Sequence, residues 1–349
     1  MFAGVVHAPF DIRYEEIPTP LPKSNEVRIK VKYTGICGSD IPRVNGNACH
    51  FFPNILGHEF SGIVDTVGNE VQNVVPGDHV AGVPLVPCME CDDCKSGNYS
   101  LCKHYSFIGS RRQGSFAEYV NVPAQNVFKF DNDVSFLKGA LFEPSSVALH
   151  ALYCADYQPG KSTLVLGCGT IGLFAIQWAR ILGATQIAAV NRSKGKLPLA
   201  KKMGAAVTVS TSDEDYYEQL MDYTAGKGYD YILDCTGNVS SMKESFRLAA
   251  NKAHICMVGT PKEPISFSVQ EWEQMNRKEF LLTGSWMSYS FPFPGKEWEM
   301  TAKHFHLGDL LFDEQMIDRI IPLSNIREAF SLFTIPGCVK GKILIDSEC

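Results

Sequence analysis

Long apolar runs, dense basic runs and a basic leader are all missing from this 349-residue chain. Its longest apolar stretches, such as 162–166 and 186–190, have the length of a strand, whereas a membrane-spanning helix needs about 20 apolar residues. We therefore expect no membrane segment. The formal net charge of -6 and the lack of a Lys/Arg cluster argue against a nucleic-acid partner and favour a small molecule.

The sequence also shows no internal repeat and no low-complexity tract. Residues 1–7 are apolar but no basic segment precedes them, so we interpret them as a first strand and expect a cytoplasmic protein. Twelve cysteines would suit a disulfide framework only in a small secreted protein. In a chain of this length we expect reduced thiols.

Two domains are predicted from the length and from a change of texture along the chain. Residues 1–145 contain short β-branched segments separated by Gly, Pro and Asn, which is typical of an irregular, mostly antiparallel β domain or barrel. After Pro144 the apolar spacing becomes helical, with the proline suited to a first helical turn. The segment 287–349 is irregular again, and we expect it to complete the first domain.

Strands and helices alternate in residues 146–286, which predicts an α/β domain with a doubly wound parallel sheet. The expected helices include 170–182, which ends at Gly183, and 194–203, which ends at Gly204. The expected strands are 162–166, 186–190, 206–210, 229–234, 254–258 and 280–284.

A glycine-rich turn follows the first of these strands. The segment 167–172 is G-x-G-x-x-G, placed between an apolar strand and an amphipathic helix, which is the context that dinucleotide binding needs. Gly167 permits the tight turn, Gly169 lets the backbone approach a pyrophosphate, and Gly172 allows the helix to pack closely on the strand. The phosphates then lie at the helix N-terminus.

The second strand ends at Asn191, where such folds usually carry an acidic residue that binds the adenosine ribose. Asn191 can still bond a free 2′-hydroxyl, while Arg192 can pair with a 2′-phosphate. We therefore expect NAD, with NADP as the alternative. The expected cofactor-binding residues are Gly167, Gly169, Thr170, Ile171, Gly172, Asn191, Arg192 and Lys196.

Four cysteines stand close together between residues 87 and 103, with the spacing C-x2-C-x2-C-x7-C. This spacing lets four thiolates converge tetrahedrally on one zinc ion. Such a site leaves no coordination position free, so we interpret it as structural. Its ligands are Cys88, Cys91, Cys94 and Cys102.

A catalytic zinc needs other ligands, usually three of mixed type, with a free position for water or substrate. Candidates are Cys37, His58, Glu59 and Glu143. Glycines flank Cys37 and precede His58, and they permit a backbone tight enough to present these side chains inward.

At these residues the chain resembles the zinc-dependent medium-chain dehydrogenases, from residue 3 to about residue 345. The resemblance implies a GroES-like β-barrel catalytic domain over 1–145 and 287–349, and a Rossmann domain over 146–286. It implies that Cys37, His58 and Glu143 are catalytic zinc ligands and that Glu59 enters or leaves the metal shell. It also implies that the four-cysteine loop is a structural zinc lobe. A carboxylate at 143 is similar to the polyol and threonine dehydrogenase branch.

The implied reaction is hydride transfer from a secondary alcohol to the nicotinamide, with Ser39 contacting the substrate oxygen and relaying its proton. Three stretches, 37–43, 107–112 and 284–290, resemble the branch that oxidises hexitol phosphates, with galactitol 1-phosphate the expected substrate. A phosphorylated polyol calls for cationic side chains. Candidates near the substrate are Arg43, His50, Arg111, Arg112 and Trp286, with Lys296 a further cation.

Alternatives remain open at this stage. Unphosphorylated polyols such as sorbitol, L-threonine and butanediol are oxidised on the same kind of metal shell. A nonenzymatic nucleotide-binding protein on this fold belongs to a different class, although such relatives commonly lack the zinc ligands that this chain has. We expect a homodimer or homotetramer, with the strand at 281–286 available for pairing at a sheet edge.

Overall fold

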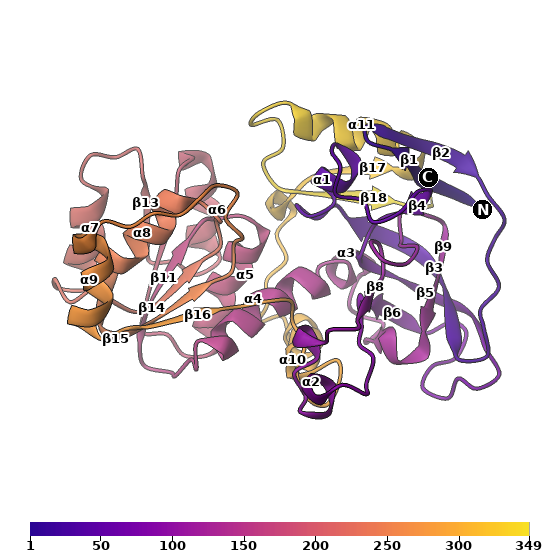
Figure 1. Cartoon of the computed structure of the whole chain (residues 1–349), viewed down its shortest axis with the longest axis horizontal. Helices are drawn as coiled ribbons and strands as arrows, with labels where there is room; N and C mark the ends of the chain where they lie inside the picture. Colours follow the sequence, from indigo (N-terminus) through magenta and orange to yellow (C-terminus); the bar gives the residue numbers. More distant parts are fainter. Residues whose placement is uncertain (349) are drawn as a thin grey trace. The chain divides into compact units, whose positions relative to one another are not determined.

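The computed structural model describes residues 1–348 and separates into two compact units. The first unit contains Met1–Glu143, Tyr289–Leu307 and the chain from Phe312 on; the second contains Pro144–Ser288 and Gly308–Leu311. In Figure 1 the first unit combines the indigo start of the chain with its yellow end. Among the described residues, no helix has the length and apolar content needed to cross a membrane.

The first unit is built on a twisted β structure whose main sheet has the order β10-β6-β5-β3-β18-β17, with β9 also paired to β3. Two smaller sheets, β2-β1-β4 and β7-β8, complete it. The strands are β1 (Phe2–Ala8), β2 (Asp11–Glu16), β3 (Glu26–Gly35), β4 (Asn54–Ile55), β5 (Glu59–Val67), β6 (His79–Gly82), β7 (Leu85–Val86), β8 (Ser106–Phe107), β9 (Tyr119–Pro123), β10 (Val127–Lys129), β17 (Ile317–Pro322) and β18 (Lys342–Asp346).

Alternation along β3 explains how this sheet forms a core. Val27, Ile29 and Val31 point to one face and are fully buried against β5, β6 and β9. Short helices connect the strands: α1 (Ile41–Val44), α2 (Asp92–Lys95), α3 (Phe136–Gly139), α10 (Lys296–Leu307) and α11 (Ile326–Ser331), with 3₁₀ turns η1 (Tyr99–Leu101), η2 (Ala124–Asn126), η4 (Glu314–Met316), η5 (Leu323–Asn325) and η6 (Leu332–Thr334).

The second unit is a six-stranded sheet with the order β13-β12-β11-β14-β15-β16, and all of its neighbouring strands are parallel. The order reverses between β11 and β14, as in doubly wound folds, and this confirms the predicted fold class. The strands are β11 (Ser162–Leu166), β12 (Gln186–Asn191), β13 (Val207–Ser210), β14 (Tyr229–Asp234), β15 (Ala249–Met257) and β16 (Leu281–Gly284).

Helices α5 to α9 pack against this sheet (Figure 1). The helix that follows the glycine turn ends one residue before the predicted limit, and the predicted helix at 194–203 is a 3₁₀ turn followed by a short helix. The helical elements are α4 (Phe142–Cys154), α5 (Thr170–Ile181), η3 (Lys194–Lys196), α6 (Leu197–Lys202), α7 (Tyr216–Tyr223), α8 (Val239–Leu248) and α9 (Val269–Lys278).

Candidate active site

Three predicted ligands meet in the first unit. The ligand atoms of Cys37, His58 and Glu59 all lie within 4.8 Å of one another. Cys37 follows the end of β3 and Glu59 opens β5, and the pairing of these two strands brings them together. A Cβ on Gly35 would lie 2.3 Å from Glu59 Oε2, so any larger residue there would displace the Glu59 carboxylate. Gly57, at φ +94°, supplies the left-handed turn before His58.

Asp40 orients the imidazole of His58. Its Oδ1 lies 3.4 Å from His58 Nδ1, and its Oδ2 accepts a hydrogen bond from the Cys37 backbone N–H at 3.1 Å. Burial opposes protonation of His58, but the Asp40 and Cys37 charges outweigh it and raise the His58 pKa well above its usual value. A carboxylate against Nδ1 leaves Nε2 for a metal ion. The sequence reasoning did not single out Asp40 as a positioning group.

Lys342 neutralises Glu59. Its Nζ lies 2.8 Å from Glu59 Oε1 and 2.6 Å from Oε2, and it also donates to the carbonyl oxygen of Ile36 at 3.1 Å. Burial lowers the Lys342 pKa, but the Glu59 carboxylate outweighs that effect and the pKa is raised. Both side chains are buried, so the two charges stabilise each other away from water. Lys342 also escaped the sequence reasoning.

Glu143, in the first turn of α4, is the fourth predicted ligand. Burial and the nearby Glu59 charge raise the pKa of its carboxyl to about 7, so it lies in the electrostatic field of the cluster. It is not part of the group of atoms within 4.8 Å of one another. A thiol, an imidazole and carboxylates are the donor types that catalytic zinc uses, so the cluster fits that metal.

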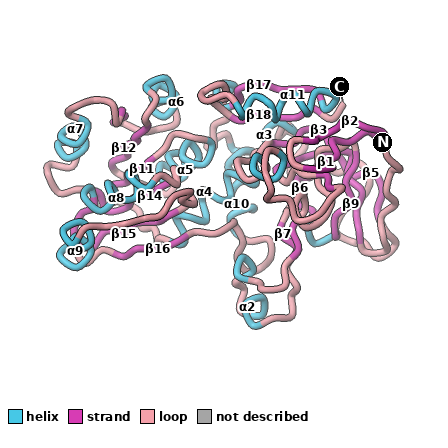
Figure 2. Tube along the Cα trace, turned by 45° about the horizontal axis from the view of Figure 1, so that its top comes forward, coloured by secondary structure: helices cyan, strands magenta, loops and turns pink. Residues whose placement is uncertain are grey.

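The four-cysteine loop forms the second cluster, and its four sulfur atoms also lie within 4.8 Å of one another. Figure 2 shows this loop-rich segment, with α2, next to β7. Backbone N–H groups of Glu90 and Cys91 lower the pKa of Cys88 to about 6, whereas burial raises that of Cys94 to about 12. Four sulfur donors at this separation fit a structural zinc ion.

The glycine turn of the second unit has the geometry expected of a phosphate cradle. Gly167 lies at φ +95°, and a Cβ on Gly172 would lie 1.8 Å from the Gly167 carbonyl oxygen. A Cβ on Gly169 would meet no atom within 4 Å, so the approach to that backbone is open. Thr170 and Ile171 form the first turn of α5, where backbone N–H groups face outward.

A cavity of ≈ 420 Å³ beside this turn is lined by four of the predicted cofactor residues, Gly167, Asn191, Arg192 and Lys196. Asn191 Oδ1 accepts a hydrogen bond from the Cys168 N–H at 3.1 Å, and its Nδ2 donates to the Ser193 carbonyl at 2.9 Å. No carboxylate lines the cavity within the described part of the chain. The polar wall therefore carries positive charge.

The predicted substrate residues separate into groups. Arg112 pairs with Glu26 at 2.7 Å, whereas Arg43 Nη1 donates to the Ser39 carbonyl at 2.5 Å. Ser39 itself is exposed in the loop that carries Cys37. His50 and Arg111 are exposed in the same unit, and Trp286 is 55% exposed in the second unit.

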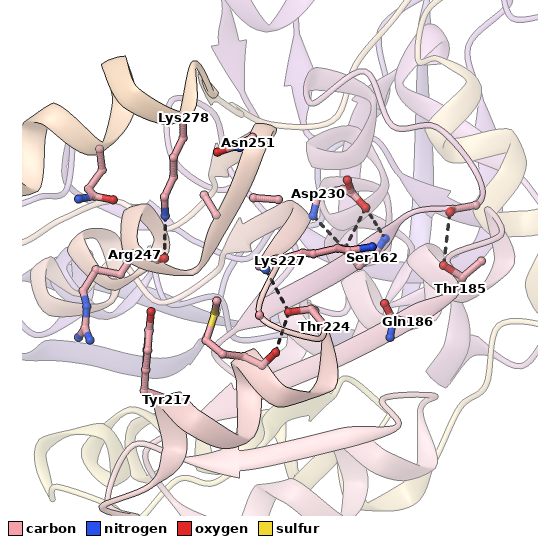
Figure 3. A pocket seen from close by; sticks show the side chains of 17 residues that line it. Ser162, Thr185, Gln186, Tyr217, Thr224, Lys227, Asp230, Arg247, Asn251 and Lys278 are labelled. Atoms are coloured by element: carbon pink, nitrogen blue, oxygen red, sulfur yellow. Dashed lines mark hydrogen bonds between the residues drawn. The ribbon is translucent and has the colours of Figure 1, made fainter.

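A further cavity, of ≈ 920 Å³, lies at the end of the second unit's sheet where its strands begin (Figure 3). It is bordered by the starts of β11, β12 and β14, opposite the glycine turn. Its polar groups are largely satisfied internally: Asp230 accepts from the Ser162 backbone at 3.0 Å, and Lys278 donates to the Arg247 carbonyl at 2.8 Å. None of the predicted site residues lines it.

Comparison with known families and proteins agrees with these two clusters and the cradle. Residues 23–132 match the alcohol dehydrogenase GroES-like domain, and residues 170–303 match the zinc-binding dehydrogenase domain. The chain belongs to the zinc-dependent alcohol dehydrogenase family, whose members combine a GroES-like domain with a Rossmann domain. It is an oxidoreductase that acts on CH–OH groups.

The chain is also similar to individual proteins of this family. The chain is 40% identical to galactitol 1-phosphate 5-dehydrogenase of Escherichia coli K12 over 337 residues, covering 95% of each chain. It is 36% identical to L-threonine 3-dehydrogenase of Bacillus velezensis, covering 96% of this chain and 95% of that one. The crystal structure of galactitol-1-phosphate dehydrogenase from Escherichia coli superposes with a TM-score of 0.94 at 36% identity, covering 99% and 100% of the two chains.

Proposed function

We propose that the protein oxidises a secondary hydroxyl of a polyol phosphate to a ketone, with galactitol 1-phosphate as the leading substrate. The observation that carries this proposal is the cluster of half-buried Cys37 with buried His58 and Glu59, next to Asp40 and Lys342. Support for the substrate comes from the 40% identity to galactitol 1-phosphate 5-dehydrogenase.

In this proposal Cys37, His58 and Glu143 would hold the catalytic zinc, and Glu59, restrained by Lys342, would be the carboxylate that enters or leaves its shell. Zinc held there would make the substrate hydroxyl more acidic and would polarise the product carbonyl. The Ser39 hydroxyl takes the proton of the substrate hydroxyl and passes it to water. A bound nicotinamide would accept the hydride of the same carbon with both electrons of the C–H bond, which balances the oxidation of the alcohol to a ketone.

The cofactor is a nicotinamide dinucleotide with its pyrophosphate at the glycine turn. We propose NAD, and the cavity beside Asn191 and Arg192 makes NADP the alternative to test. The ratio of kcat/KM with NAD to that with NADP decides between them. If NADP is preferred, Arg192→Ala should lower kcat/KM for NADP at least tenfold more than for NAD.

Steady-state oxidation of galactitol 1-phosphate, galactitol, sorbitol, sorbitol 6-phosphate, L-threonine and butanediol tests the substrate. We expect galactitol 1-phosphate to give the highest kcat/KM. A higher value with threonine, butanediol or an unphosphorylated polyol would overturn the leading substrate. Lack of turnover of every compound by the zinc-loaded protein would favour the nonenzymatic alternative.

We also propose a homo-oligomer in which β16 pairs with its copy. This strand is the edge of its sheet, and Leu281 and Leu282 are 55% and 41% exposed. Light scattering of the purified protein should give the mass of a dimer or tetramer. The variant Leu282→Lys should shift that mass toward the monomer, while an unchanged mass would place the interface elsewhere.

A further inference from the structure

Two arginines and a histidine of the first unit lie on segments that hydrogen bonds connect near Cys37. Arg43 lies on α1, and His50 lies on the loop that follows it. Arg111 comes from a segment 61 residues further along the chain than His50. The pKa of His50 lies below its usual value, because of burial in the first place and then because of the charges of Arg111 and Arg43. Both guanidinium groups therefore act on one imidazole.

Hydrogen bonds of the intervening chain hold these segments together. The Ala48 N–H donates to the Pro42 carbonyl at 3.1 Å, which folds the His50 loop back onto α1. Asn54 is fully buried, and its Nδ2 donates to the Ser110 carbonyl at 3.2 Å. A buried contact therefore holds the segment that precedes Arg111 against the segment that follows His50, although the Arg111 and His50 side chains themselves are exposed.

No carboxylate of residues 1–348 forms an ion pair with Arg43, His50 or Arg111, in contrast to other arginines of the unit. Arg112, the next residue, pairs with Glu26 at 2.7 Å, and Arg28 pairs with Asp65 at 2.7 Å. Like charges gathered without a counter-ion repel one another, and a bound anion would relieve that repulsion.

Contacts with neighbouring groups restrict the orientation of both guanidinium groups. Arg43 Nη1 is fixed on the Ser39 carbonyl at 2.5 Å, whereas its Nε is buried and has no hydrogen-bond partner. A buried donor without an acceptor is costly. The Arg111 guanidinium lies 4.6 Å from the centre of the Tyr105 ring, a stacking that limits its orientations. Planar forks held in this way suit the oxygen atoms of a phosphate group.

Arg43 lies close in the chain to the candidate metal centre, and this position suggests what the cluster binds. Arg43 is bonded to Ser39, and Ser39 lies two residues after the ligand Cys37. A substrate whose hydroxyl reacts at the metal would bring its far end to a neighbouring group. An uncharged polyol has no use for unpaired cations, whereas a phosphate dianion forms charge-assisted hydrogen bonds with them.

We propose that Arg43, His50 and Arg111 bind the phosphate group of the substrate and so select phosphorylated over unphosphorylated open-chain polyols. This inference rests on the proposed function and assigns its specificity to three residues. Arg112, which Glu26 neutralises, is not part of the phosphate site.

The test compares kcat/KM for galactitol 1-phosphate with kcat/KM for galactitol in the zinc-loaded full chain. Arg111→Gln should lower the ratio of these values at least tenfold, through a rise in KM for the phosphorylated substrate. Arg43→Lys retains the charge but loses the fork, so we expect a smaller loss in the same direction. The matched control is Arg13→Gln, which removes an exposed arginine paired with Asp11 on β2 and should keep the ratio of the wild type. A ratio within twofold of wild type in Arg111→Gln and Arg43→Lys would overturn the proposal.

A second measurement separates this proposal from the proposed function. Titration calorimetry of the zinc-loaded protein with inorganic phosphate does not require turnover. If neither polyol is oxidised, the proposed reaction fails, and the phosphate site still stands if Arg111→Gln weakens phosphate binding at least tenfold. Equal phosphate affinity in wild type, Arg111→Gln and Arg13→Gln would overturn it.

Discussion

The two sulfur-containing clusters of the first unit differ in their donors and in their surroundings. The cluster of Cys88, Cys91, Cys94 and Cys102 offers four identical donors on one loop of the chain. The cluster of Cys37, His58 and Glu59 offers three donor types from two segments, the end of β3 and the start of β5, with two further buried charges, Asp40 and Lys342, packed against it.

This difference separates structural stabilisation from chemistry. Four thiolates fill a tetrahedral shell, so an ion held there has no free position for a substrate and only stabilises the loop. A cluster of mixed donors leaves a coordination position free for a ligand. Burying its imidazole and carboxylate groups also costs folding free energy.

Removing the Cys37 thiolate should have the largest effect. In Cys37→Ser we expect kcat/KM to fall by more than about 10³-fold, equivalent to about 4 kcal/mol of transition-state stabilisation. Cofactor binding, followed by the quenching of protein fluorescence, should persist because the glycine turn belongs to the second unit. Unchanged turnover in this variant would refute a catalytic role for the cluster.

Breaking the four-cysteine cluster should instead act on stability. Cys94 is buried, and Cys94→Ser removes one of four ligands, so the bound metal should fall from two ions per chain to one. We expect a loss of several kcal/mol in the free energy of unfolding, with active molecules retaining their kcat near the wild-type value. Metal analysis and urea unfolding measure the two effects. A wild-type count of one metal per chain would contradict the scheme.

Lys342 tests how the charge of Glu59 is supported. Lys342→Met leaves the buried Glu59 carboxylate without its cation, and we expect a loss of about 3 kcal/mol in the free energy of unfolding. The double variant Lys342→Met/Glu59→Gln removes the uncompensated charge and should recover part of that loss. Equal stability of the single and double variants would mean that Glu59 is not held by Lys342.

These buried charges mark where sequence reasoning reached its limit. The four-cysteine loop and the glycine turn were predictable because each is local, so residue spacing alone carries the geometry. Lys342 is 283 residues from Glu59, and their contact depends on β18 pairing with β3. No spacing rule connects them. Asp40 was within reach, since an acidic side chain three residues after Cys37 can bond both that backbone and a neighbouring ligand.

The fold, too, could be predicted only where the sequence carries a local signal. The strands of the parallel sheet are apolar runs bounded by turns, and five of the six predicted strands begin or end where the structure places them. In the first unit, two-residue strands such as β4 and β7 exist only through their pairing partners, so the chain carries no local signal for them.

Asp40 offers a milder way to disturb the mixed cluster. Asp40→Asn retains the shape but removes the negative charge beside His58 Nδ1, so the imidazole should be less well oriented and a weaker ligand. We expect a 10- to 100-fold loss of zinc affinity at this cluster, with the four-cysteine cluster unaffected. Competition with a chelator measures both affinities. Equal zinc retention in wild type and Asp40→Asn would show that Asp40 does not support the metal.

The smallest effect concerns a third group, Asp131, Asp133 and His306, which has metal-ligand atoms but is exposed. His306 Nδ1 lies 2.9 Å from Asp133 Oδ2, and the hydrogen bond to Asp133 raises the pKa of His306. Because the folded pKa lies above the usual value of about 6.5, the pair stabilises the fold fully below that pH and loses its effect as the pH rises through the raised pKa. His306→Gln should therefore lower the melting temperature by on the order of 1 °C at pH 5.5 and not at pH 9. The metal content of His306→Gln should stay at two ions per chain, because we expect these exposed donors to bind no metal. A lower count would show that this group binds a metal ion as well.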